Sequence, residues 1–259
     1  MKLYVLTLVA AVLLDGQTAP APRDLFLLIG QSNMAGRGVV EEQDRQPIPR
    51  VFMLNKAMEW VPAIDPVHFD KPDIAGVGLA RSFAKVLAAA DSSASIGVIP
   101  AAFGGTSLDE WKPGGKLYTE AVRRAKFATR TGKLRGILWH QGEADAGNKE
   151  NAASYLQRFS AMIAQLRTDL GEPNVSVVVG QLGEFLSEGL PPRSPFAALV
   201  DEQLAIIPLA VPHVAFVSSG GLTSNPDHLH FDARSQREFG RRYALAFLSL
   251  DASWPMPGR

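Results

Sequence analysis

A serine near the start of the chain stands where a nucleophile is expected. Segment 30–36 reads Gly-Gln-Ser-Asn-Met-Ala-Gly and directly follows the apolar run 25–29. A serine at a strand-to-helix turn exposes its hydroxyl at the edge of a sheet, and backbone N–H groups there point toward a developing oxyanion. Capping of a helix by Ser32 is the alternative, because serine is a preferred cap. The segment lacks the second glycine of a Gly-x-Ser-x-Gly elbow.

One of the five histidines has a carboxylate at a suitable spacing to act as a general base. The histidines are His68, His140, His213, His228 and His230. Asp227 precedes His230 by three residues, so one short loop can present an imidazole and a carboxylate that orients the ring and stabilises its protonated form. A turn capped by Asp227 is one alternative, and a metal site within 227–232 is another. A triad of Ser32, His230 and Asp227 is therefore the hypothesis, and it needs no metal or other cofactor.

Candidate hydrogen-bond donors follow two further apolar runs. Segment 103–107 reads Phe-Gly-Gly-Thr-Ser, and glycine lets backbone N–H groups come close to a reacting carbonyl because it has no Cβ. Gln141 offers a side-chain NH₂ group, and Glu143 adds a carboxylate beside it. Ordinary loop polarity is the alternative for both. The glycines form neither a Walker loop nor a dinucleotide fingerprint, so no phosphate cofactor is indicated.

Five apolar runs alternate with longer stretches that have apolar residues at helical spacing. The runs are 25–29, 96–99, 136–139, 175–179 and 214–217, and the helical stretches are 74–90, 117–130, 152–170, 195–207 and 232–250. Strands without alternating polarity, each followed by a helix, predict a parallel sheet covered on both faces. Such sheets bind ligands at the carboxyl ends of their strands, where the polar segments lie. We expect an α/β fold, a three-layer α/β/α sandwich with a five-stranded parallel sheet.

Composition and charge exclude several classes of protein. The 259 residues are 46% apolar, which is enough for the core of one sizeable α/β domain. The 26 basic residues balance 26 acidic ones, so no net field attracts nucleic acid or an anionic membrane. The chain has no cysteine, which excludes disulfides, thiolate nucleophiles and sulfur-ligated zinc. Oligomeric state leaves no signal in the sequence.

The first residues have the pattern of a signal peptide. Lys2 precedes the apolar run 3–14, which is about as long as a signal-peptide core and shorter than the roughly 20 apolar residues of a membrane span. An uncleaved anchor and a buried first strand are the alternatives. We expect residues 1–21 to be a signal peptide, residues 22–259 to form a single domain, and the mature protein to be secreted or periplasmic without a membrane attachment.

Four motifs in order resemble those of carbohydrate esterase family 6, a branch of the SGNH hydrolase superfamily that includes acetylxylan esterases and relatives of sialate O-acetylesterases. The motifs are Gly-Gln-Ser-Asn-Met-Ala-Gly at 30–36, Phe-Gly-Gly-Thr-Ser at 103–107, Trp-His-Gln-Gly-Glu at 139–143 and Asp-His-Leu-His at 227–230. The match extends over nearly all of the chain after the leader. The resemblance implies a flavodoxin-like fold with Ser32 as nucleophile and His230 as base.

The resemblance also implies the groups around these two residues. The oxyanion hole would comprise the N–H groups of Ser32 and Gly105 and the side chain of Gln141. Asp227 is favoured as the acid partner of His230, and Glu143 is the alternative acid.

The expected activity is a serine esterase that removes O-acetyl groups from carbohydrate, from acetylated xylan or a related polysaccharide, through an acyl-serine intermediate. Sialate O-acetylesterase-like activity and a catalytically silent carbohydrate-binding domain are the alternatives. A lipase or thioesterase is disfavoured, because the chain has no long apolar insertion. Substrate contacts are expected from Gln31, Asn33 and Trp111. The rings of Trp60, Trp111 and Trp139 are candidates for stacking on sugars, with core packing as the alternative.

Overall fold

The computed structural model describes Pro22, residues 24–187 and residues 194–254. The predicted signal peptide, residues 1–21, lies outside the described residues. Within the described ranges, no helix combines the length and apolarity needed to cross a membrane.

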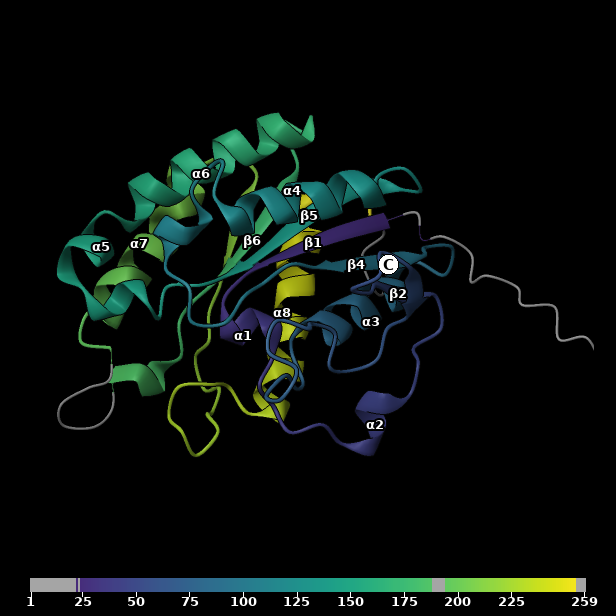
Figure 1. Cartoon of the computed structure of the whole chain (residues 1–259), viewed down its shortest axis with the longest axis horizontal. Coiled ribbons are helices and arrows are strands. Elements are labelled where there is room, and N and C mark those ends of the chain that lie inside the picture. Colours follow the sequence, from purple (N-terminus) through teal and green to yellow (C-terminus); the bar gives the residue numbers. More distant parts are fainter. Residues whose placement is uncertain (1–21, 23, 188–193, 255–259) are drawn as a thin grey trace, which may run out of the picture.

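A sheet forms the middle of the molecule (Figure 1). It has seven strands in the order β3-β2-β4-β1-β5-β6-β7. Its strands are β1 (Asp24–Gly30), β2 (Val51–Leu54), β3 (Trp60–Pro62), β4 (Ile96–Pro100), β5 (Lys133–His140), β6 (Ser176–Gly180) and β7 (Val214–Val217). All neighbouring strands are parallel except β2 and β3, which pair antiparallel. The five predicted runs are β1, β4, β5, β6 and β7. The predicted strand count was wrong because β2 and β3 are short and lie in a proline-interrupted segment.

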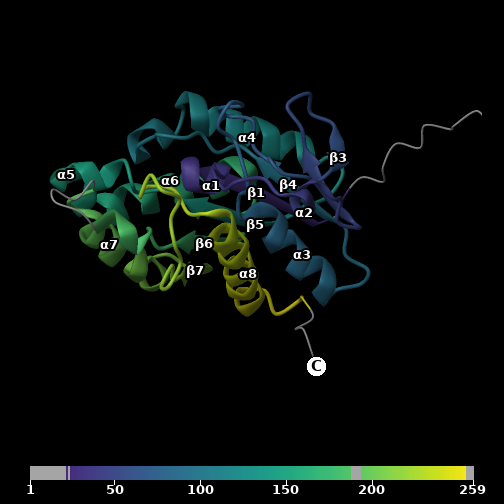
Figure 2. The same cartoon turned by 90° about the horizontal axis from the view of Figure 1, so that it is seen from below.

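Helices cover both faces of this sheet, which confirms the predicted three-layer α/β fold. Figure 2 shows α4 and α6 on one side of the strands and α3 and α8 on the other. The long helices are α3 (Ala80–Ala90), α4 (Lys116–Ala128), α6 (Tyr155–Leu170), α7 (Ala197–Ala210) and α8 (Ala233–Leu250). The short ones are α1 (Ser32–Ala35), α2 (Glu42–Arg45), α5 (Lys149–Ala153) and the 3₁₀ turns η1 (Leu108–Trp111), η2 (Asp145–Gly147) and η3 (Glu184–Ser187).

Helix α3 begins at Ala80, although the apolar pattern predicted a start at residue 74. The reason is a short antiparallel bridge between Gly38 and Val77. The N–H of Val77 donates to the carbonyl of Gly38 at 2.8 Å, and the N–H of Gly38 donates to the carbonyl of Val77 at 3.0 Å. These bonds hold the chain extended before α3 and tie it to the segment that follows α1.

The apolar face of α8 fixes the loop that precedes the helix. Phe239, Tyr243 and Phe247 are fully buried, and the Phe247 ring packs edge-on against Phe26 of β1 with 5.0 Å between centroids. Asp232 caps the helix, because its Oδ1 accepts the N–H of Ser235 at 2.7 Å. Such a cap contributes about 1 kcal/mol. The end of the loop between β7 and α8 is therefore held by both a packed helix and its cap.

Strand β1 lies at the point where the chain changes direction across the sheet. The chain places β2, β3 and β4 on one side of β1, and then crosses to β5, β6 and β7 on the other. Gly30 at the end of β1 pairs with His140 at the end of β5, and a Cβ on Gly30 would overlap the His140 carbonyl oxygen. In open α/β sheets, such a switch point opens a crevice at the carboxyl ends of the strands. Ser32 follows β1 at this crevice.

Candidate active site

Ser32, His230 and Asp227 come together in one hydrogen-bonded chain. Ser32 begins α1 directly after β1, and the other two lie in the loop between β7 and α8. The His230 Nε2 atom is 3.0 Å from the Ser32 Oγ atom, and the His230 Nδ1 atom is 2.6 Å from Asp227 Oδ2. A carboxylate only accepts, so Nδ1–H donates to Asp227 and Nε2 is left to accept from the serine hydroxyl. Both distances lie within range of proton transfer.

The loop holds Asp227 ionised beside the imidazole. The Asp227 Oδ1 atom accepts the N–H groups of Leu229 at 2.9 Å and His230 at 3.0 Å. His228, between Asp227 and Leu229, has a φ of 51°, and this left-handed conformation turns the chain so that both donors face the carboxylate. Partial burial would raise the pKa of Asp227, but the bonds from His230 and Leu229 hold it below its ordinary value. The carboxylate thus stays charged and able to stabilise a protonated His230 ring.

The alternative of a metal site at 227–232 gains no support from the geometry. Among the described residues, no group of three or more His, Cys, Asp or Glu side chains is arranged to hold a metal ion. Asp232, which that alternative requires, is taken up by its bonds to Thr223 and to the N–H of Ser235.

Glu143 lies away from the His230 ring, which corrects its expected role as the alternative acid. Its buried Oε1 accepts Nδ2 of Asn33 at 2.5 Å and lies 3.4 Å from Nε2 of His140. Complete burial would raise the pKa of Glu143, but His140 and Asn33 lower it below its ordinary value. The Nδ1 atom of His230 is already bound to Asp227. Glu143 is therefore a charged group beneath the site and is not the partner of the imidazole.

Asn33 is a bridge within the protein, which corrects its expected role as a substrate contact. Its Nδ2 donates to the Leu229 carbonyl at 3.1 Å as well as to Glu143, and its Oδ1 accepts the N–H of Phe231 at 3.0 Å. The side chain is buried and every polar atom is engaged. Asn33 thereby ties the residue beside Ser32 to both chain neighbours of His230. The sequence signal for this role was only the adjacency of Asn33 to the serine.

Gln141 has no free amide proton, which corrects its expected role as an oxyanion donor. The fully buried Nε2 donates to Asp145 Oδ2 at 2.6 Å, to the Thr106 carbonyl at 3.0 Å and to Gln31 Oε1 at 3.3 Å. Its Oε1 accepts the hydroxyl of Tyr155 at 2.9 Å. An amide nitrogen has two protons, and here both point to protein acceptors. Asp145 and Tyr155 fix this side chain, and neither was predicted from the sequence.

The Gln31 side chain is oriented by two donors. Its Oε1 accepts the backbone N–H of Ala144 at 3.3 Å and Nε2 of Gln141 at 3.3 Å. A backbone N–H can only donate, so this end of the amide must be the oxygen. Within the part of the chain that the structure describes, no acceptor lies within hydrogen-bonding distance of Gln31 Nε2. An uncommitted N–H₂ group therefore remains next to Ser32.

The two glycines after β4 differ in what their N–H groups do. Gly104 donates to Asp70 Oδ2 at 2.9 Å, and Asp70 is also paired with Arg37 at 2.7 Å in a buried ion pair. Gly105 has a φ of 83°, a conformation that favours glycine. Among described residues, the N–H groups of Gly105 and Ser32 have no acceptor. A Cβ on Gly104 would lie 3.3 Å from Ser32 Cβ, so this loop packs against the serine.

Of the three tryptophans predicted as sugar platforms, Trp111 and Trp139 belong to the core and Trp60 is half-buried against it. Trp111 is fully buried, donates from Nε1 to Thr106 Oγ1 at 3.1 Å and packs edge-on against Trp139, which is buried as well. Trp60 lies on β3 at the sheet edge, with Nε1 directed to Thr131. The expectation that Trp111 contacts substrate is thus wrong, because a fully buried ring has no face to offer a sugar.

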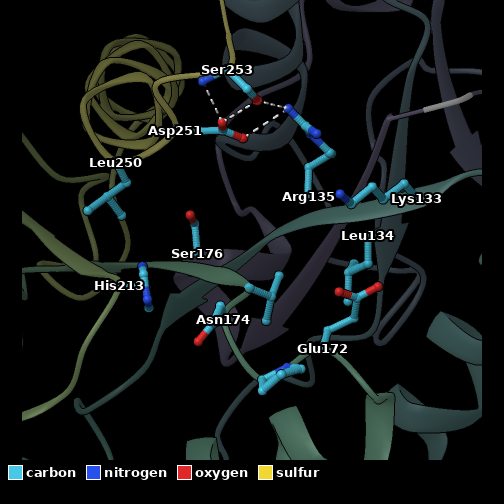
Figure 3. Close-up of a pocket in the computed structure, with 12 residues that line it drawn as sticks. Lys133, Leu134, Arg135, Glu172, Asn174, Ser176, His213, Leu250, Asp251 and Ser253 are labelled. Atoms are coloured by element: carbon cyan, nitrogen blue, oxygen red, sulfur yellow. Dashed lines mark hydrogen bonds and ion pairs between the residues drawn. The ribbon is translucent and has the colours of Figure 1, made fainter.

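A hollow of about 340 Å³ lies at the amino-terminal ends of the strands, away from Ser32 (Figure 3). It is lined where β5 and β6 begin, by residues that include Lys133, Ser176 and His213. Arg135 is paired there with Asp251 at 3.0 Å. Since Ser32 follows the carboxyl end of β1, this hollow is separated from the candidate site by the length of the strands.

Comparison with known proteins identifies relatives over nearly the whole chain. Residues 22–249 match the family model described as carbohydrate esterase, sialic acid-specific acetylesterase. A probable carbohydrate esterase of Arabidopsis thaliana is 30% identical over 255 residues, which cover 90% of this chain and 93% of the relative. A solved Arabidopsis thaliana structure has a TM-score of 0.80 at 29% identity and covers 88% of this chain and 98% of its own.

Two more distant structures share the fold. NanS has a TM-score of 0.71 at 18% identity, with 89% of this chain and 98% of NanS covered. Axe2, an acetylxylan esterase from Geobacillus stearothermophilus, has a TM-score of 0.52 at 14% identity, with 93% of this chain and 99% of Axe2 covered. With the family model matched along most of its length, the chain belongs to the family of carbohydrate esterases described as sialic acid-specific acetylesterases and is a carboxylic ester hydrolase.

Proposed function

We propose that the protein is a serine esterase that removes O-acetyl groups from carbohydrate through an acyl-serine intermediate. The observation that carries this proposal is the chain from Ser32 Oγ to His230 Nε2 at 3.0 Å and from His230 Nδ1 to Asp227 Oδ2 at 2.6 Å. This is the order of nucleophile, base and orienting carboxylate that acyl transfer requires.

In the first half of the reaction, Ser32 becomes acetylated. His230 Nε2 takes the hydroxyl proton while Ser32 Oγ forms a bond to the acetyl carbonyl carbon, and the carbonyl oxygen takes the negative charge. Asp227 stabilises the protonated ring. The tetrahedral species then collapses, the bond to the sugar oxygen breaks, and His230 gives its proton to that oxygen.

In the second half, water releases the acetate. His230 Nε2 removes a proton from the water, whose oxygen attacks the acetyl carbonyl carbon. The bond to Ser32 Oγ breaks, and the proton returns to the serine oxygen. The protein ends as it began, and neither half needs a metal or an organic cofactor.

The oxyanion donors in this mechanism are the N–H groups of Ser32 and Gly105, which have no acceptor among the described residues. As the side-chain donor we propose Gln31 Nε2 in place of Gln141, because the Gln141 protons are occupied and serve to orient Gln31. Loss of one oxyanion donor typically lowers kcat by about 10²–10³-fold.

Acetylated xylan or a related polysaccharide is the proposed substrate, and O-acetylated sialic acid is the second candidate. The family description names sialic acid, and the structurally similar Axe2 is called an acetylxylan esterase. Secretion or a periplasmic location is proposed from the pattern of residues 1–21.

Alanine substitution of the two reacting residues tests the proposal. Acetate release from acetylated xylan, O-acetylated sialic acid and a small aryl acetate is measured for the wild type, Ser32→Ala and His230→Ala. We expect kcat to fall by at least about 10⁴-fold in both variants. Ser249→Ala and His213→Ala serve as controls, since both residues are exposed and lie outside the site. Retention of most activity in either Ser32→Ala or His230→Ala would contradict the proposal.

A further inference from the structure

The loop that packs against the candidate nucleophile carries an exposed aromatic ring. Phe103 has 39% of its surface exposed. The other large apolar side chains that are exposed among the described residues are all aliphatic. It lies just after β4 and directly before Gly104 and Gly105. Exposure of a phenylalanine ring forgoes the free energy of burial, and aromatic side chains commonly line small-molecule sites.

The backbone holds Phe103 in a fixed relation to Ser32. The Phe103 N–H donates to the Gly30 carbonyl at 3.0 Å, and the Phe103 carbonyl accepts Thr106 Oγ1 at 2.8 Å. Gly30 and Ser32 are two residues apart at the end of β1, and the next residue after Phe103 packs against Ser32. The backbone N–H and carbonyl of Phe103 are thus both held, in the loop that packs against Ser32.

Two hollows adjoin the ring. One has a volume of about 740 Å³ and is lined by Phe103, Thr106 and Leu117 together with charged side chains such as Asp109 and Lys116. The other has a volume of about 260 Å³ and shares Phe103 and Leu117 with the first. The larger volume falls within the roughly 300–1,000 Å³ range of small-molecule sites.

The chemistry of this surface fits a sugar better than a long acyl chain. A pyranose ring has an apolar C–H face, which packs on an aromatic ring, and a rim of hydroxyls, which need donors and acceptors. Carboxylates and ammonium groups in the larger hollow supply both. Lys71 Nζ lies 5.8 Å from the Phe103 ring centre and 3.7 Å from where a Cβ on Gly105 would stand.

We infer that Phe103 is the platform on which a sugar ring of the acetylated substrate stacks while its ester reaches Ser32, and that the 740 Å³ hollow takes adjoining sugars. The inference rests on the proposed function and gives Phe103 the part that the sequence suggested for Trp111. Phe103 thereby determines specificity for carbohydrate esters over simple esters.

The test compares an ester with a sugar and one without. The ratio of kcat/KM on an acetylated xylo-oligosaccharide to kcat/KM on ethyl acetate is measured, with O-acetylated sialic acid replacing the xylo-oligosaccharide if only that sugar is cleaved. We expect Phe103→Ala and Phe103→Leu to lower the ratio about three- to tenfold, mainly through KM of the sugar ester. Phe103→Tyr keeps the ring and restores the ratio. Leu209→Ala, at an 88% exposed position on α7, is the matched control.

Two results would overturn the inference. Unchanged kcat/KM on both esters in Phe103→Ala would show that the ring does not contact the sugar. An equal loss on both esters, which also leaves the ratio unchanged, would show that Phe103 only supports the glycine loop. Failure of the proposed function is read separately, from the activity of Ser32→Ala on ethyl acetate, so the two failures are distinguishable.

Discussion

Two carboxylates near the same strand ends have opposite surroundings. The Asp227 side chain is 42% exposed in the loop before α8, and the Glu143 side chain is 2% exposed after β5. Asp227 faces the imidazole of His230, which contacts Ser32, whereas Glu143 lies against the amide of Asn33 and the buried imidazole of His140. Both carboxyls have a lowered pKa, so the two are equally charged at neutral pH. Charge therefore does not distinguish the two carboxylates; they differ in that the imidazole beside Asp227 also contacts Ser32 Oγ.

The contrast extends to the residues around the two carboxylates. The surface loop presents the imidazole, and the buried layer of Asn33, Gln141, Glu143 and Asp145 is bonded almost entirely to protein. A buried polar group that loses its partner costs about 1–3 kcal/mol. The buried layer thus resists displacement and keeps the loop and the serine in register.

The largest expected effect separates the two carboxylates directly. Asp227→Asn is expected to lower kcat by about 10²–10⁴-fold, because an amide can donate to Nδ1 and favour the wrong tautomer of His230. Glu143→Gln keeps an oxygen for Asn33 and is expected to lower kcat by about tenfold or less. Steady-state kinetics on a small aryl acetate measure both. An equal loss in the two variants would remove the distinction between them.

An intermediate loss of activity is expected when Asn33, which links the His230 loop to the buried layer, is replaced. Asn33→Ala removes the partners of the Leu229 carbonyl and the Phe231 N–H, so the His230 loop loses two of its restraints. We expect kcat to fall by about 10–100-fold with KM nearly unchanged, and the Tm to fall as well. Kinetics and thermal unfolding are measured on the same preparation. A raised KM with an unchanged kcat would instead return Asn33 to a substrate-binding role.

The smallest expected effect is a change in stability alone, and it comes from a third carboxylate, Asp201 on α7. Burial raises the pKa of Asp201 to about 7, although the Leu182 N–H, bonded at 2.8 Å, opposes the shift. A carboxyl with a raised pKa favours the folded state below its unfolded pKa, and this contribution is lost as pH rises through about 7.

Asp201→Asn keeps an oxygen for Leu182 and does not ionise. The Tm of this variant relative to the wild type should therefore increase between acidic and mildly alkaline pH. Thermal unfolding across that range gives the comparison, with kcat as the control for an intact site. A Tm difference that stays constant with pH would show that Asp201 does not titrate on folding.

The sequence predicted the fold because its strands are continuous apolar runs. Strands β1, β4, β5 and β6 are buried on both faces over most of their length, and the half-buried β7 is apolar throughout, so composition alone indicates all five. Strands β2 and β3 were missed, because strands of four and three residues between prolines show no lasting pattern. The start of α3 was misplaced for a related reason, since only tertiary contact reveals the bridge between Gly38 and Val77.

The candidate site was predicted unevenly. Residues 30–36 and 227–230 identified the serine, imidazole and carboxylate by type and spacing. The parts of Gln141, Glu143 and Trp111 could not be predicted, because residue type does not tell which polar groups are already bonded or which rings are buried. Arg37 and Asp70, which hold the glycine loop, lie in regions where the sequence shows no periodicity.

The most direct test of the central claim is covalent labelling of the activated serine. A fluorophosphonate reacts when a serine oxygen, made nucleophilic by its base, attacks phosphorus and expels fluoride. Peptide mass spectrometry of the labelled wild type should place the adduct on Ser32, and His230→Ala should label far more slowly. An adduct on another residue, or an unchanged rate in His230→Ala, would contradict the account.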